Sequence, residues 1–154
     1  MVEMNFMLKP NAKPMKHQPY RLNPQVKEKV KKVIDRMINT DLISPMEKYD
    51  WIIPIIIQSN KKTKDIKVYF DYQILNFACV HDPFLTPFNN EVLDQVVGNE
   101  DYSFTNGFLG YNQVQIIEED NKKETSTTNM ESFSYNVIPF GQKNASAMFF
   151  RIVI

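Results

Sequence analysis

The stretch that decides the fold is residues 51–70, which read WIIPIIIQSNKKTKDIKVYF. Trp51 to Ile57 is rich in β-branched apolar residues and is broken only by Pro54, so it predicts a strand with an edge position or a bulge at that proline. Residues 60–65 are polar and include three lysines, which predicts a turn with a basic character, and residues 66–70 have the pattern of a returning strand. The stretch therefore predicts a β-hairpin with a basic tip.

A helix is predicted ahead of this hairpin. Asn23 can cap a helix, Pro24 suits its first turn, and apolar residues recur at helical spacing at Val26, Val30, Val33, Ile34, Met37 and Ile38. Four lysines between residues 27 and 32 fall largely on the remaining surface, and Ser44-Pro45 ends the region. Residues 1–22 carry three prolines among basic and polar residues, so we expect an extended N-terminal arm.

Further strands and helices are predicted after the hairpin. Residues 88–97 have the pattern of a short helix that ends at Gly98, with Val92, Leu93, Val96 and Val97 facing inward. Strands are expected at 101–105, 113–117 and 132–138, and a helix is expected from Gln142 onward. Strand pairs separated by helices indicate a mixed α+β fold.

Composition and charge limit the possible functions. The chain has 154 residues and no net charge, which is enough length for one domain with a core. Residues 1–73 carry a formal charge of +6 and residues 74–154 a charge of −6. A basic first half suggests a polyanionic partner and an acidic second half suits a metal site, whereas the alternative is two solvated surfaces of opposite sign. No apolar run is long enough to cross a membrane, and the first residues lack the pattern of a secretory signal.

Common catalytic and metal-binding motifs are missing from the sequence. It has no glycine-rich phosphate loop, no nucleophile elbow and no paired-cysteine spacing. Cys79 is the only cysteine, so we expect a buried thiol and a reducing compartment. His17 and His81 are expected to be solvated or hydrogen-bonded, and Glu118, Glu119 and Asp120 are expected to be solvated in a turn.

Five phrases taken together carry a resemblance to a known family. They are PYRLNP at 19–24, WIIPI at 51–55, DYQILN at 71–76, YSFTNGFLGYNQ at 102–113 and YNVIPFGQKNA at 135–145. In this order and spacing they resemble the reverse transcriptase, or RNA-directed DNA polymerase, of gypsy-class long-terminal-repeat retrotransposons, from about Lys16 to about Phe149. The resemblance implies the fingers and an incomplete palm of a right-hand polymerase, with an arm at 1–22, a fingers-like part at 23–100 and a palm-like part at 101–154.

The resemblance also implies a two-metal mechanism of nucleotidyl transfer. Two Mg²⁺ ions held by aspartates activate the primer 3′-hydroxyl and stabilise the leaving pyrophosphate. Asn106 occupies the position of the family's first metal-binding aspartate, and its amide lacks the negative charge that bridges the ions. The other aspartates belong to an Asp-Asp hairpin that the family has downstream; this chain has no Asp-Asp pair, and we expect it to stop before that hairpin. We therefore expect no Mg²⁺ binding and no polymerase activity from the chain alone.

Four positions match the family's nucleotide-binding residues. Lys67 stands where a basic fingers residue contacts the incoming triphosphate, although the family usually has arginine there. Tyr111 matches the aromatic residue under the nucleotide sugar, and Phe140 and Gly141 match the palm segment at the base and template. The alternative is that Tyr111 and Phe140 are core aromatics. Gln73, Gln142 and the polar segment 125–131 depart from the family pattern.

Several functions stay open at this point. The main hypothesis is an inactive retroelement remnant, for which the RNA or DNA template-primer and dNTP of the family would be weak partners or none. The alternatives are a fingers subunit of a split polymerase, a non-enzymatic nucleic-acid-binding module, or a reading frame without a stable product. We expect no membrane partner and an intracellular location, which would be mitochondrial if a plant organelle genome encodes the chain.

Overall fold

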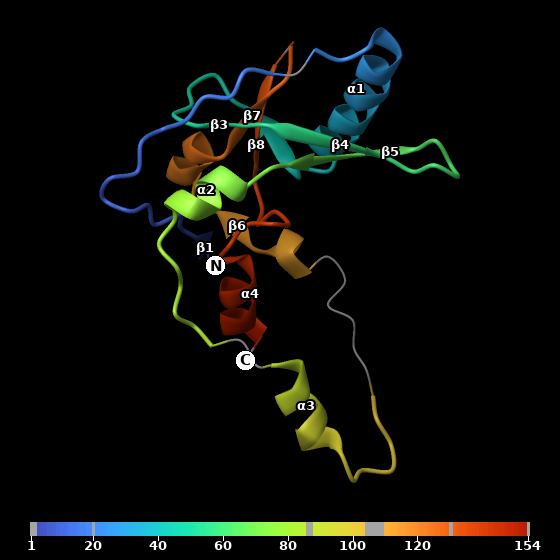
Figure 1. The fold of residues 1–154 in the computed structure, drawn as a ribbon, viewed down its shortest axis with the longest axis vertical. Helices are drawn as coiled ribbons and strands as arrows, with labels where there is room; N and C mark the ends of the chain where they lie inside the picture. Colours follow the sequence, from blue (N-terminus) through green and yellow to red (C-terminus); the bar gives the residue numbers. More distant parts are fainter. Residues whose placement is uncertain (1–2, 20, 86–87, 104–109, 130, 154) are drawn as a thin grey trace.

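A computed structural model describes residues 3–19, 21–85, 88–103, 110–129 and 131–153. The helices are α1 (Pro24–Asn39), α2 (Gln73–Ala78), α3 (Asn89–Val96) and α4 (Ala145–Val153), with 3-10 turns η1 (Gly110–Gln113) and η2 (Glu118–Lys123). The strands are β1 (Glu3–Met4), β2 (Ile43–Pro45), β3 (Ile52–Ile53), β4 (Ile55–Ser59), β5 (Ile66–Phe70), β6 (Gln115–Ile116), β7 (Thr125–Thr127) and β8 (Ser132–Tyr135). Figure 1 shows α1, the hairpin of β4 and β5, and the β3–β7–β8 region together at one end of the molecule.

Helix α1 forms as its sequence predicts. The Asn23 side chain accepts a hydrogen bond of 3.1 Å from the backbone N–H of Gln25, and Pro24 begins the helix. Val30 and Ile34 are buried on the face that contacts β5. An N-cap of this kind contributes about 1 kcal/mol, so the start of the helix is fixed by local sequence.

Pro54 makes the chain change sheets between β3 and β4. Strand β3 pairs in parallel with β7 in a four-stranded sheet of order β2-β8-β7-β3, whereas β4 pairs with β5 in a separate two-stranded sheet. The hairpin register runs from Ile55 opposite Phe70 to Ser59 opposite Ile66, which leaves residues 60–65 as the tip. A proline cannot donate to a strand ladder, so a break at Pro54 is its expected effect, and the predicted hairpin is confirmed.

The N-terminal segment contributes directly to the core. Strand β1 pairs in parallel with β6, and Met4 and Phe6 are each only 1% exposed. They join Leu75, Cys79 and Ile116 in the main apolar cluster. The buried Cys79 matches the expectation, but the burial of Met4 and Phe6 was not predicted because the segment has no periodic pattern.

Several predicted features differ in the structure. Helix α3 forms, but the prediction that its apolar residues face inward is wrong for Val92, Leu93 and Val97, which are 44%, 59% and 74% exposed. Figure 1 shows α3 away from the sheets.

The expected strands around residue 106 also differ. Residues 101–103 do not form a strand, and 104–105 lie outside the described residues. Residues 113–117 give only the two-residue β6 after the turn η1, and α4 starts at Ala145 rather than at Gln142. Among the helices that the structure describes, none is long and apolar enough to cross a membrane.

Candidate functional site

A basic groove lies between α1 and the tip of the β4–β5 hairpin. It has a volume of about 520 Å³ and is lined by Lys29, Lys32, Val33, Arg36, Thr63, Lys64, Asp65, Ile66 and Lys67. Lys29, Lys32 and Arg36 share one face of α1 because they are spaced by three and four residues. Five cationic side chains surround the groove against a single carboxylate, so it presents a concave positive surface.

The hairpin and α1 are held together at this groove. The ammonium of Lys29 donates a hydrogen bond of 3.4 Å to the backbone carbonyl of Lys64, and α1 packs on β5. Lys67 is exposed on β5, opposite Gln58 of β4, and it also borders a smaller hollow of about 200 Å³ with Ser59 and Asn60. Lys67 is therefore placed to act together with the cations of the groove.

Tyr111 and Phe140, which sequence matching singled out, contact each other. Their ring centroids are 5.2 Å apart in an edge-on arrangement, and Tyr111 makes a similar contact of 5.1 Å with Phe149 of α4. The Tyr111 hydroxyl lies 3.2 Å from the Ser146 hydroxyl. Tyr111 is half-buried against the core, whereas Phe140 is 65% exposed, so the core-aromatic alternative describes Tyr111 but not Phe140.

Asn76 of α2 holds the turn that contains Gly141. Its side-chain amide donates to the carbonyl of Gly141 at 2.7 Å and accepts from the backbone N–H of Lys143 at 2.7 Å. Gly141 has φ +89°, a conformation that other residues rarely adopt. Tyr111, Phe140 and Gly141 thus lie where η1, α4 and this turn meet, whereas Lys67 lies on the hairpin.

The buried carboxyl group of Glu124 was missed by sequence reasoning. Glu124 is 0% exposed, and its carboxyl accepts a hydrogen bond of 3.2 Å from the Tyr72 hydroxyl. Burial raises the pKa of Glu124 well above its usual range, although hydrogen bonds from Tyr72 and from the Tyr135 backbone oppose the shift. Burial, together with the nearby Glu124, raises the pKa of Tyr135 to about 12 and raises the pKa of Tyr72 well above its usual value. None of these three side chains lines the groove, so the group has a structural position.

The expectation that Asp120 is solvated is wrong. It is 2% exposed and accepts hydrogen bonds from the backbone N–H of Phe6 and from the ammonium of Lys123, whereas Glu118 and Glu119 are exposed as expected. The lysine three residues later on the same turn is the one signal in the sequence that pointed to this ion pair.

The acidic side chains do not form a two-magnesium site in the described part of the chain. Asn106 lies outside the described residues. Elsewhere in the ranges that the structure describes, no three histidine, cysteine, aspartate or glutamate side chains come together. Asp120 is already paired with Lys123, and Glu124 is held by Tyr72, so this donor set does not fit the ions.

The sequence is similar to viral and transposon polyproteins. No family model matches the chain. The enzymatic polyprotein of cauliflower mosaic virus (strain D/H) is 25% identical over 97% of this chain and 23% of its own length. The Pol polyprotein from transposon opus of Drosophila melanogaster is 29% identical over 90% of this chain and 14% of its own length. The chain therefore spans less than a quarter of the curated relatives it matches.

Solved structures agree with the expected fold class. The protease-reverse transcriptase of prototype foamy virus superposes with a TM-score of 0.76 at 17% identity, over 96% of this chain and 20% of that chain. A structure of the foamy viral enzyme with an RNA/DNA hybrid gives a TM-score of 0.73 with the same coverage. This likeness confirms an α+β fold of the fingers and palm region.

Proposed function

We propose that this reverse-transcriptase-like domain binds RNA or DNA through the groove between α1 and the hairpin tip, and that it does not transfer nucleotides by itself. The observation that carries the proposal is the concentration of five cations around one concave surface with a single acid. In this proposal the chain is a nucleic-acid-binding module, and the groove is its binding surface. We also propose that the chain descends from a reverse transcriptase of the gypsy class.

A polynucleotide fits this surface better than a small anion does. Cations on α1 and on the hairpin tip face the same groove from two elements, so they can contact successive phosphates of one strand. Arg36 adds a planar donor that can bind a phosphate through two hydrogen bonds. The foamy viral enzyme was solved with an RNA/DNA hybrid and with double-stranded DNA, which supports the same class of partner here.

The four family-matched residues receive proposed roles in the same complex. Lys67 would contact a phosphate, because it is exposed beside the groove. Tyr111 and Phe140 would offer aromatic surface to a sugar or base, and Gly141 would let the backbone approach closely. The stability of their arrangement depends on Asn76, which holds the turn.

Absence of nucleotidyl transfer is proposed from the sequence at residue 106. An amide cannot replace a bridging carboxylate, and such a loss costs several kcal/mol of transition-state stabilisation, or roughly several powers of ten in rate. The same amide argues against a split polymerase, because a partner chain would not restore this carboxylate.

A gel-shift titration at rising salt tests the binding proposal. We expect the triple variant K29A/K32A/R36A to lose most of its affinity for single-stranded and hybrid probes at low salt. A matched control, K13A/R21A/K48A, removes the same charge from exposed residues that do not line the groove. Equal losses in the two variants would refute the groove as the binding surface.

Primer extension with Mg²⁺ or Mn²⁺ tests the second half of the proposal. We expect no template-dependent incorporation by the purified chain. Incorporation that disappears on replacing Lys67 would overturn the inactive assignment while leaving nucleic-acid binding in place.

A further inference from the structure

We propose that the chain associates with itself head to tail, through a basic-rimmed apolar socket on one copy and the exposed face of α3 on the next. The socket is defined by Pro19, Leu22, Lys27, Val30, Lys31, Ile34, Ile55 and residues 127–129. It lies on the other side of α1 from the nucleic-acid groove, and the two surfaces share no lining residue. The proposal is therefore independent of the proposed function.

The socket is suited to one apolar side chain. Its floor is aliphatic, formed by Leu22, Val30, Ile34 and Ile55, and its volume of about 20 Å³ is little more than a single water needs. An aliphatic tip would displace poorly bound water from such a floor, which is favourable at about 25 cal/mol per Å² of apolar surface. The socket is thus a place for one anchor residue rather than for a whole ligand.

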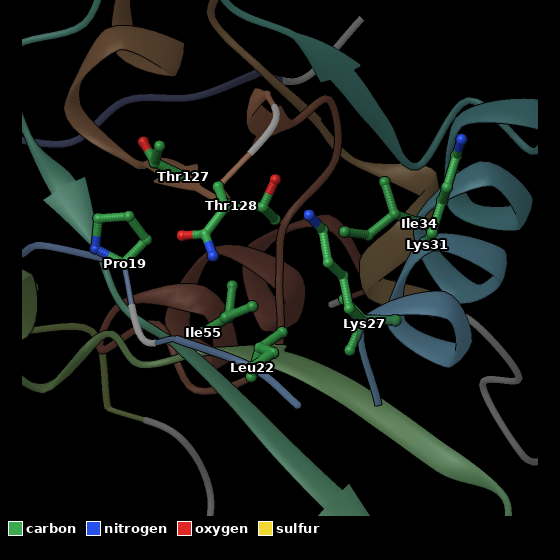
Figure 2. A pocket seen from close by; sticks show the side chains of 10 residues that line it. Pro19, Leu22, Lys27, Lys31, Ile34, Ile55, Thr127 and Thr128 are labelled. Atoms are coloured by element: carbon green, nitrogen blue, oxygen red, sulfur yellow. The ribbon is translucent and has the colours of Figure 1, made fainter. Parts of the chain in front are cut away.

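Lys27 gives the socket its charge preference. Figure 2 shows the Lys27 side chain reaching from α1 across the pocket toward Thr128. Lys27 is half-buried, and its ammonium has no hydrogen-bond or ion-pair partner among the residues that the structure describes. Lys31 lies one turn further along α1, so two like charges flank the socket, and no acidic residue lines it. A partner segment with an apolar anchor residue would fill the aliphatic floor, and a carboxylate next to that anchor would pair with the two lysines.

Helix α3 presents such an anchor. Leu93 is 59% exposed on α3, with Asp94 next to it in the sequence, and Val97, which follows the last residue of the helix, is 74% exposed. Helix α3 itself carries Glu91 and Asp94 and no lysine or arginine, so the helix is acidic. Figure 1 shows α3 projecting far from α1, which places the two surfaces at opposite ends of one molecule.

Because the two surfaces lie at opposite ends of one molecule, they cannot meet within it, and the partner that fits is a second copy of the chain. A socket at one end and a complementary helix at the other make a heterologous contact, in which each copy uses both surfaces with different neighbours. A terminal methyl group of Leu93 would enter the socket, and Asp94 would approach Lys27 and Lys31. The opposite charges of the two halves of the sequence would strengthen the encounter at low salt.

Sedimentation velocity on nuclease-treated protein tests the contact by charge exchange. We expect the unmodified chain to associate as its concentration rises, and we expect K27E and D94K each to weaken this association about tenfold or more. Mixing K27E with D94K in equal amounts should restore association, because the charges are complementary again in the mixture. K13E and E47K, which change exposed charges outside both surfaces, serve as matched controls.

The outcomes separate clearly. A chain that stays monomeric at every concentration would overturn the proposal, and so would association that L93S leaves unchanged. Association that either charge variant weakens but the mixture does not restore would mean that α3 does not meet the socket. Because no nucleic acid is present, none of these results depends on the groove.

Discussion

The hydroxyl of Tyr72 donates a hydrogen bond of 3.2 Å to the carboxyl of Glu124, and both side chains are almost completely removed from solvent. The contact joins the start of α2 to the beginning of β7 across 52 residues of sequence. A carboxyl group in such a place is most stable in its neutral form, since a buried charge without a cation is costly. Folding of the domain is therefore linked to proton uptake at this residue.

Stability should fall as pH rises because of Glu124. Its pKa in the folded state lies above the value of 4.5 that an exposed glutamate has, so the folded protein keeps a proton that the unfolded chain releases. The contribution is complete below pH 4.5 and is lost as pH rises toward the folded pKa, at up to about 1.4 kcal/mol per pH unit. We expect thermal unfolding measured from pH 5 to pH 8 to show a falling Tm.

The variant E124Q should remove this dependence. Glutamine keeps an acceptor for Tyr72 but cannot become charged. The Tm of E124Q should therefore change less with pH than the Tm of the unmodified chain, and it should be higher at neutral pH. E119Q, which changes an exposed glutamate five residues earlier, is the control and should follow the unmodified curve. Parallel curves for E124Q and the unmodified chain would contradict the linkage.

Replacing Asn76 with alanine should loosen the turn at Gly141. The change removes two hydrogen bonds of 2.7 Å and leaves the Gly141 carbonyl and the Lys143 N–H without this partner, at a cost of about 1–3 kcal/mol. Urea unfolding measures the loss, and Q73A, which changes an exposed residue of the same helix, should cost much less. A loss no larger than that of Q73A would show that the turn holds its shape without Asn76.

Gly110 should not tolerate a side chain. A Cβ atom at this position would lie 2.5 Å from the ring of Phe149, so G110A must displace the ring that also contacts Tyr111. We expect a destabilisation of about 1–3 kcal/mol, as for overpacking elsewhere in cores. The double variant G110A/F149L should be less unstable than the sum of the two single changes; simple additivity would argue against the clash.

The salt dependence of binding should report the number of phosphates in the groove. Each lysine that neutralises a phosphate contributes about 1 to the slope of log affinity against log salt concentration. K29A/K32A should therefore reduce the slope by about 2, as measured by fluorescence anisotropy with a labelled oligonucleotide. An unchanged slope with weaker binding would mean that these lysines support the fold of the groove and do not touch phosphate.

Local sequence patterns predicted the elements with strong periodicity or specific caps. The cap at Asn23, the hairpin tip at 60–65 and the break at Pro54 depend on neighbouring residues only, so they could be predicted. The burial of Met4, Phe6 and Asp120 depends on partners more than 110 residues away, and no local pattern reports it. Similarly, the periodicity of α3 predicted a helix correctly but not whether a partner covers its apolar face.

The candidate site divides in the same way. Basic residues at helical spacing and at a hairpin tip could be recognised separately, but only the packing of α1 on β5 brings them to one groove. The contact between Tyr111 and Phe140 depends on α4, which supplies Phe149 and Ser146 to the same cluster. The surroundings of Asn106 stay a prediction from sequence.

Strand β1 has a consequence for the order of events during synthesis on the ribosome. Glu3 and Met4 pair with Gln115 and Ile116, and the Phe6 N–H is bound by Asp120, so these residues emerge long before their partners exist. At a synthesis rate of about 5–20 residues per second, the apolar side chains of Met4 and Phe6 stay without their packing partners for roughly 5–25 s. Closure of this segment is thus a late step of folding, and until then the nascent chain exposes apolar side chains that favour aggregation.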